Sequence, residues 1–447
     1  MKNKILLAFI ALLAAVCLFA SCGDTPTIEI SEDGYWVING EKTDVLAKGD
    51  KGDSTASDNL QGLAFYLRDD GTYAVEVGYA KYLSNIEIPA TYNEKPVTTI
   101  LSYAFADCKD VKSIVIPQTV TSIEDYAFSD CVNLESIAIP TTVTSIGKYA
   151  FSGCESLTSA VIPEGVTSIG ERTFASCTSL ESVVIPDSVT IIDHFAFYYC
   201  RSLTAVVIPD NVTIIGNEAF YNCTSLTSAK IGSSVTSIPD SAFKNCKNLT
   251  DVVIPDSATS IGDSAFSGCI NLTSAVIGNN VTAIGDYAFY NCKKLASIDI
   301  PDSVTRLGDY QFDSCSNLTS AVIGDGVKSI GVSSFKNCKK LTNVVIGKSV
   351  KSIGNDAFYN CVSLESILLP DGLTSIAVWA FYNCRSMTSA VIPGSITSIG
   401  GYAFNSCTSL VDVYYSGSEE NWSKMKFDSD NENLAKATVH YNYVYEE

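Results

Sequence analysis

The feature that most constrains this chain is a cysteine that returns at a fixed interval. Fourteen of its 16 cysteines, from Cys108 to Cys407, lie in one series with an interval of 23 residues and no insertion or deletion. A period of this length is typical of solenoids, in which one coil cannot bury its apolar residues alone and stacked coils share a core. The length of 447 residues alone would favour about three domains. The repeat replaces that expectation with one long solenoid.

Each unit follows the pattern Ala-Phe-x-x-Cys-x-x-Leu-x-x-Val-x-Ile-Pro-x-x-Val-Thr-x-Ile-Gly, as around Cys177. In that unit Leu180, Val183 and Ile185 reproduce the spacing of a leucine-rich-repeat core. Because side chains alternate along a strand, Val183 and Ile185 are expected to point inward and Val184 outward. The proline that follows ends the strand. The unit therefore predicts a parallel β-sheet on one face, a second short strand after the proline, and a turn or short helix at the Phe-Cys corner.

This unit resembles that of the BspA-like leucine-rich-repeat proteins of bacterial surfaces, and the resemblance covers about residues 86–415. The resemblance implies a right-handed solenoid, here with 14 repeats of 23 residues. It also implies a secreted or surface-anchored protein that adheres to host extracellular proteins or to other bacteria. Because family members differ at their exposed positions, the resemblance implies no particular ligand.

The N-terminus carries the pattern of an export signal. Lys2 and Lys4 precede an apolar run over residues 5–20, and small residues follow, which is the layout of a secretory signal peptide. The run is shorter than the ~20 residues that a transmembrane helix needs. Residues 19–22, Phe-Ala-Ser-Cys, resemble a bacterial lipobox without its usual leucine. The resemblance implies a lipid on Cys22, and the alternative is cleavage nearby with plain secretion.

Composition divides the remainder of the chain. A polar stretch after the signal has turn residues at 33–34 and 39–40, and a segment rich in Gly, Lys and Asp follows as a flexible spacer. The ends of the repeat series favour caps, since a solenoid must cover its open core. The predicted organisation is a signal peptide at 1–21, a polar tether with a small hairpin at 22–59, an N-terminal cap at 60–100, the solenoid at 101–415 and a C-terminal cap at 416–447.

Charge and histidine content oppose most other classes of function. The formal net charge of −20, from 29 basic and 49 acidic residues, opposes binding to nucleic acid or to anionic lipid. Only two histidines are present, His194 at a variable position of the repeat and His440 near the C-terminus, and no catalytic motif accompanies them. We therefore predict no catalytic residues, no metal site and no cofactor.

The regular cysteines are predicted to be structural. One alternative is a disulfide ladder, since cysteines of adjacent coils come near the distance at which thiols can be bridged. Another is zinc, which is opposed by the absence of any Cys-x-x-Cys pair or nearby histidine. Buried cysteine behaves as a small hydrophobic residue. Free, buried thiols are the interpretation that we favour.

One set of candidate binding residues lies at the outward position of the main strand. We call it the valine face, and it comprises Val161, Val184, Val207, Val253, Val276, Val322, Val345, Leu368 and Val391. An exposed apolar strip of this size indicates a contact surface. The alternative is that valine recurs only because it suits a β-strand in any orientation.

A second set of candidates flanks the repeat phenylalanine. The first aromatic column lies two residues before it and contains Tyr126, Tyr149, Tyr287, Tyr310 and Tyr402, together with Tyr103, Phe195 and Trp379. The second aromatic column lies one residue after it and contains Tyr198, Tyr221, Tyr290, Tyr359 and Tyr382. Tyrosine gives a large contact area at low entropic cost and so suits a binding surface. The alternative is that these rings pack over the adjacent coil and extend the core.

Together these patterns predict a non-catalytic binding or adhesion protein of the bacterial surface, exported and lipid-anchored. Its predicted partners are extracellular or cell-surface proteins of a host or of other bacteria, and its only membrane contact is the lipid. The alternatives are a secreted protein and a structural envelope spacer with no dedicated ligand. The sequence specifies neither the ligand nor an oligomeric state.

Overall fold

The computed structural model describes residues 28–30, 35–38, 41–46 and 62–445. The chain forms two units, Met1–Leu60 and Gln61–Glu447. In the first unit, strands β1 (Ile28–Ile30), β2 (Tyr35–Ile38) and β3 (Glu41–Leu46) form an antiparallel sheet in the order β1-β2-β3. The predicted signal peptide and Cys22 lie outside the described residues.

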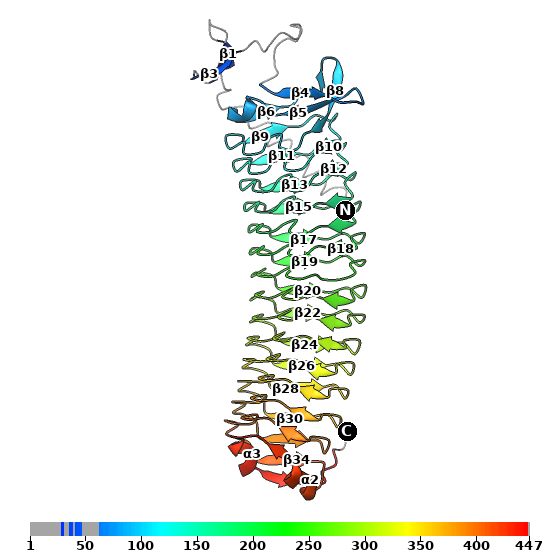
Figure 1. Cartoon of the computed structure of the whole chain (residues 1–447), viewed down its shortest axis with the longest axis vertical. Helices are drawn as coiled ribbons and strands as arrows, with labels where there is room; N and C mark the ends of the chain where they lie inside the picture. The colour runs from blue at the N-terminus through cyan, green and yellow to red at the C-terminus, as the bar shows by residue number, and fades with distance from the viewer. Residues whose placement is uncertain (1–27, 31–34, 39–40, 47–61, 446–447) are drawn as a thin grey trace, which may run out of the picture. The chain divides into compact units, whose positions relative to one another are not determined.

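The second unit is a solenoid of about sixteen turns, with its main strands stacked one above another (Figure 1). The main strands form six ladders of two to four strands. Within a ladder the strands are parallel, and in the repeats a residue pairs with the one 23 positions later, as Ser159 does with Ser182. The main strands are β6 (Asn85–Glu87), β9 (Ser113–Val115), β11 (Ser136–Ala138), β13 (Ser159–Val161), β15 (Ser182–Val184), β17 (Ala205–Val207), β19 (Ser228–Lys230), β20 (Asp251–Val253), β22 (Ser274–Val276), β24 (Ser297–Ile300), β26 (Ser320–Ile323), β28 (Asn343–Ile346), β30 (Ser366–Leu368), β32 (Ser389–Ile392), β34 (Asp412–Tyr415) and β36 (Thr438–His440).

A second row of parallel strands, most of them two residues long, follows the proline of the unit, as the repeat predicts, or the glycine that replaces it at 278, 324 and 347. It comprises β8 (Lys95–Ile100), β10 (Ser122–Ile123), β12 (Ser145–Ile146), β14 (Ser168–Ile169), β16 (Ile191–Ile192), β18 (Ile214–Ile215), β21 (Ser260–Ile261), β23 (Ala283–Ile284), β25 (Arg306–Leu307), β27 (Ser329–Ile330), β29 (Ser352–Ile353), β31 (Ser375–Ile376), β33 (Ser398–Ile399) and β35 (Lys426–Phe427). The predicted solenoid with parallel strands is confirmed. The predicted count of 14 repeats follows the cysteines, and the additional turns belong to the two ends.

The caps differ from the repeats. At the N-terminal end, β4 (Ala64–Leu67) and β5 (Tyr73–Glu76) form an antiparallel hairpin, β7 (Thr91–Tyr92) pairs with β8, and η1 (Ala80–Tyr82) is a turn of 3₁₀-helix. At the C-terminal end, α2 (Glu419–Lys424) and α3 (Glu432–Lys436) lie beside the last strands (Figure 1). Among the described residues, no helix has the length and apolar character to cross a membrane.

The core is a ladder of phenylalanine rings, one per coil, from Phe105 to Phe404. All fourteen rings are fully buried, and neighbouring rings stack with centroids 5.0–5.6 Å apart. Offset stacking of this kind adds to the free energy gained by burial. The leucine, valine and isoleucine positions of the repeat complete the core.

Each Phe-Cys corner is a turn with two left-handed residues. The residues two before and two after the phenylalanine have positive φ, as Tyr126 (58°) and Asp130 (59°) do around Phe128. This conformation turns backbone N–H groups toward the next coil, so that the amide of Phe128 donates to the carbonyl oxygen of Ala150 at 2.7 Å. Most L-residues avoid the left-handed region. The first aromatic column therefore stands on a backbone position that is fixed by hydrogen bonds between coils.

The repeat cysteines are buried, unpaired thiols. Thirteen of them hydrogen-bond through Sγ to the carbonyl oxygen of the phenylalanine one coil earlier, as Cys154 does to Phe128 at 3.2 Å, and the distances span 3.0–3.3 Å. The same carbonyl oxygen also accepts from the amide of the cysteine in its own coil, as that of Phe128 does from Cys131 at 3.3 Å. The thiol thus fills a small space and also donates a weak hydrogen bond.

The native thiols are expected to resist alkylation. Burial raises the pKa of the Cys269 thiol to about 12, and the thiolate is the reactive species. Incubation of the native protein with a maleimide at neutral pH should label almost none of the repeat cysteines, whereas denaturation without a reductant should expose all fourteen. Peptide mapping by mass spectrometry measures both. Poor labelling after denaturation would contradict the prediction, because it would show that the cysteines are oxidised.

Candidate binding surface

The valine face lies on the outside of the solenoid, between two rows of buried residues. On β20 and β22, Val253 and Val276 are 59% and 53% exposed, while their neighbours Val252 and Ala275 are buried. Strand alternation produces this arrangement, since every second side chain points away from the core. Eight of the nine side chains are exposed. Val391 is half-buried, because residues near the C-terminus of the chain lie beside it. The nine side chains thus form an apolar row in three parts, on β13–β17, on β20 and β22, and on β26–β32, with Lys230 and Asp299 at the equivalent positions of β19 and β24 between them.

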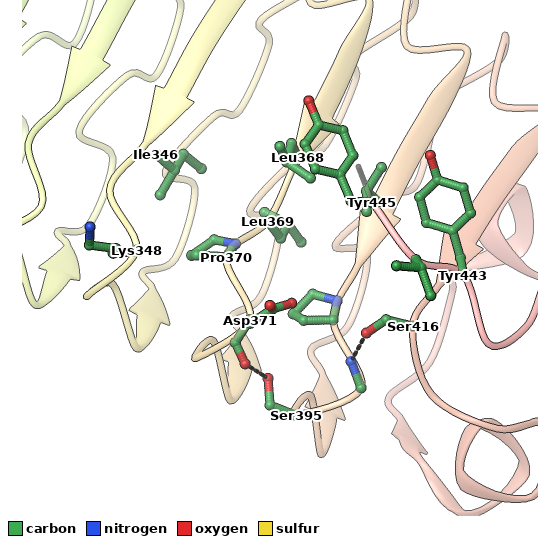
Figure 2. A pocket seen from close by; sticks show the side chains of 14 residues that line it. Ile346, Lys348, Leu368, Leu369, Pro370, Asp371, Ser395, Ser416, Tyr443 and Tyr445 are labelled. Atoms are coloured by element: carbon green, nitrogen blue, oxygen red, sulfur yellow. Dashed lines mark hydrogen bonds between the residues drawn. The ribbon is translucent and has the colours of Figure 1, made fainter. Parts of the chain in front are cut away.

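A pocket of about 770 Å³ interrupts the C-terminal end of the valine face (Figure 2). Leu368 and Val391 line it together with Tyr443 and Tyr445 near the C-terminus, which are not among the binding residues predicted from the sequence. The tail is fixed in place, because the amide of Tyr443 donates to the carbonyl oxygen of Tyr415 at 3.0 Å. The pocket therefore combines apolar side chains with polar groups, the two phenol hydroxyls among them.

The rim of this pocket is polar. The hydroxyl of Ser395 donates to the carbonyl oxygen of Asp371 at 2.6 Å, and the Ser416 hydroxyl accepts from the amide of Gly394 at 2.7 Å (Figure 2). Lys348 forms an ion pair with Asp325 at 2.8 Å. Apolar walls with a few placed polar groups are typical of binding sites.

The sequence left open whether the rings of the two aromatic columns are exposed for binding or pack over the adjacent coil, and the structure shows both. In the first column Tyr126 stacks on Tyr149 with centroids 4.5 Å apart, and in the second Tyr359 stacks on Tyr382 at 4.9 Å. The rings thus pack over adjacent coils, yet they remain partly exposed, as Trp379 does at 43%. Burial raises the pKa of several of these phenols, those of Tyr149, Tyr198 and Tyr287 among them.

Side-chain cations lie over several of these rings, and these basic residues are not among the binding residues predicted from the sequence. The guanidinium of Arg172 lies 4.5 Å from the ring centroid of Phe195 and 5.6 Å from that of Tyr149. The ammonium of Lys336 lies 4.8 Å from the Tyr359 centroid. These contacts are cation–π interactions. They arise because charged residues replace tyrosine at some column positions.

Both histidines lie at the surface of the solenoid. His194 is exposed, and His440 pairs with Asp412 at 2.8 Å on the exposed surface of the C-terminal cap. Within residues 62–445 and the three N-terminal strands, no group of three His, Cys, Asp or Glu side chains is placed to hold a metal ion.

The chain is similar to known proteins of one family. The family model for the BspA-type leucine-rich repeat region matches residues 78–204, 190–319 and 305–435. A search of curated protein sequences finds no match. A leucine-rich repeat protein from Bacteroides ovatus is 27% identical, with 87% of this chain and 99% of that chain covered and a TM-score of 0.61.

Two further solved structures are similar in sequence. A leucine-rich cell surface protein from Faecalibacterium prausnitzii is 31% identical over 84% of this chain and 99% of its own, with a TM-score of 0.47. A leucine-rich repeat protein from Eubacterium ventriosum is 25% identical over 77% and 92%, with a TM-score of 0.44. With the family model matching most of the solenoid, the chain belongs to the family of proteins with BspA-type leucine-rich repeats.

Proposed function

We propose that this chain is a non-catalytic binding protein, exported and lipid-anchored at a bacterial cell surface, that contacts extracellular or cell-surface proteins through the valine face. The observation that carries the proposal is the row of exposed apolar side chains on the main strands, which only Lys230 and Asp299 interrupt between Val161 and Val391. Water-exposed apolar strips of this extent favour contact with a partner. The pocket of about 770 Å³ at the end of this row supplies a deeper anchoring point.

The mechanism is the addition of many weak contacts. Each exposed valine offers a small apolar area, and parallel strands hold these areas at a constant spacing on a rigid support. Many copies in one membrane would engage a surface together, which raises the avidity without any single strong contact. The lipobox-like residues 19–22 support attachment to that membrane through Cys22.

Replacing two neighbouring valines by threonine is expected to weaken binding about tenfold without unfolding the protein. Val253→Thr with Val276→Thr suits the test, because the two residues are paired on adjacent strands and both are exposed. Threonine keeps the β-branched shape and adds a hydroxyl that a dry interface would have to desolvate. Binding of the full chain to immobilised extracellular-matrix proteins and to intact bacterial cells is measured by surface plasmon resonance and by adhesion counts.

A matched control uses apolar residues away from the valine face. Ile191→Thr with Ile214→Thr changes two residues that are paired on β16 and β18, in the second row of strands, and it should leave binding unchanged. The absence of saturable binding of the wild-type protein to any of these surfaces would refute the proposal and favour an envelope spacer. Equal losses in both pairs of variants would refute the role of the valine face.

A further inference from the structure

Two pockets lie along the two aromatic columns. They are lined by residues at the same positions of the repeat, four coils apart. The first, of about 420 Å³, is lined by Lys244, Tyr287 and Tyr290. The second, of about 470 Å³, is lined at the equivalent positions by Lys336, Trp379 and Tyr382. Each pocket therefore has a lysine on one side and an aromatic residue from each column on the other.

The pockets open where the first aromatic column is interrupted. Tyr287 stacks on Tyr310 with centroids 4.7 Å apart, and the coil before it carries Ser264 at the column position. The face of Tyr287 that is turned away from Tyr310 therefore meets the pocket. In the second pocket Asp356 takes the place of the missing ring beside Trp379.

A third coil shows the same position in a closed form. Phe195 occupies the column position four coils before Tyr287, and the coil before it carries Arg172. The Arg172 guanidinium covers the Phe195 ring at 4.5 Å. It fills the counterpart of the space that is open beside Tyr287, where the smaller Ser264 stands at the position equivalent to Arg172. The chain thus fills one interruption with its own side chain and leaves the two later ones accessible.

The charges of the open pockets select the class of ligand. A lysine in each pocket opposes a cationic ligand, and Lys336 is already paired with Asp356 at 3.6 Å. The net charge of −20 opposes a polyanion. A flat aromatic face beside hydroxyl, amide and ammonium groups fits a neutral ring that is apolar on one face and carries hydroxyls on its edge. Both volumes lie within the range of small-molecule sites.

We propose that these two pockets bind neutral oligosaccharides, with one sugar ring stacked on Tyr287 and one on Trp379. This inference rests on the proposed function as a binding protein and names a second ligand class for it. Four coils separate the two rings by about 19 Å along the solenoid. Repeated glycans on one surface can occupy both pockets, which strengthens attachment beyond that of either site.

The test measures binding of the full chain to maltohexaose, cellohexaose, mannohexaose and chitohexaose by calorimetry and by tryptophan fluorescence. At least one of the four should bind saturably and change the emission of Trp379. Tyr287→Ser with Trp379→Ser should weaken that binding at least tenfold. Serine is suitable because Ser264 and Ser333 already occupy this column position with the same positive φ.

Two further variants separate a loss of the pocket from a loss of the fold. Ser264→Tyr with Asp356→Tyr rebuilds the ring stack and should abolish binding although both stacking residues remain. Tyr103→Ser removes an exposed ring of the same column outside both pockets and should leave binding unchanged.

The outcomes separate this inference from the proposed function. If none of the four oligosaccharides binds, or if the pocket variants bind them as the wild type does, the inference is wrong. Protein binding through the valine face is tested separately, by the variant Val253→Thr with Val276→Thr. Binding of poly-L-proline in place of every oligosaccharide would also overturn the inference, since it would show a groove for peptides. Oligosaccharide binding without any protein binding would sustain the inference and refute the protein-contact role.

Discussion

Raising the pH from about 8 to about 10.5 is expected to unfold the solenoid in a steep transition. In eleven repeat cysteines, from Cys154 to Cys384, burial is the first cause that raises the pKa of the thiol. Below the pKa of an unfolded cysteine, about 8.5, the thiols are protonated in both states, and this contribution to stability is fully present. Above it, the unfolded chain releases protons that the folded chain retains, so the free energy of unfolding falls.

The size of the effect follows from the number of thiols. Each loses about 1.4 kcal/mol per pH unit above the unfolded pKa, so eleven lose about 15 kcal/mol per unit, which matches the whole stability of an ordinary domain. Circular dichroism during a pH titration gives the midpoint. Because phenols ionise nearby, the control is the variant Cys200→Ala with Cys246→Ala and Cys292→Ala, whose free energy of unfolding should fall less steeply by about 4 kcal/mol per pH unit. A protein that stays folded to about pH 11 would contradict the prediction.

Replacing one ring in the middle of the phenylalanine ladder should divide the solenoid into two blocks that unfold separately. Phe243→Ala removes stacking on both neighbours, at centroid distances of 5.2 and 5.5 Å, and leaves a cavity in a fully buried site. Such a truncation costs about 3–5 kcal/mol. Because each coil contacts only its neighbours, the damage is concentrated at one interface.

Urea unfolding followed by circular dichroism should then show two transitions, and hydrogen exchange should locate the weakened coil around residue 243. Phe243→Leu keeps most of the apolar volume and should unfold closer to the wild type. Tyr103→Ala, at an exposed ring, should shift the midpoint little. A single transition for Phe243→Ala at the wild-type midpoint would show that the ladder does not hold the coils together.

Most of the fold could be predicted because one unit defines every coil. The alternation of Val183, Val184 and Ile185 predicts which side chains of the main strand point into the core and which point outward. The fixed interval of the cysteines predicts the register between strands of adjacent coils. The sulfur-to-carbonyl bond of Cys154 with Phe128 could not be predicted, because it joins residues of different coils whose spacing depends on the folded backbone. The turns added at both ends carry no cysteine, and so the cysteine count missed them.

The candidate binding surface was only partly predictable. The outward position of the valine face follows from strand alternation, but the wall that Tyr443 and Tyr445 add to its last pocket depends on where the tail returns. The aromatic pockets depend on which coil follows which, since Ser264 opens a gap only because Tyr287 comes next. A comparison of coils four apart in the sequence would have revealed the matching positions of Lys244 and Lys336.

The parallel pairing of strands one coil apart has a mechanical consequence. The strands run across the long axis of the solenoid (Figure 1), so a pull along that axis loads the hydrogen bonds between neighbouring coils one interface after another. Each coil that opens releases 23 residues, which extend to about 80 Å in place of about 5 Å. A solenoid held at both ends would therefore lengthen one coil at a time under tension. Each step dissipates mechanical work and limits the force on the two attachments.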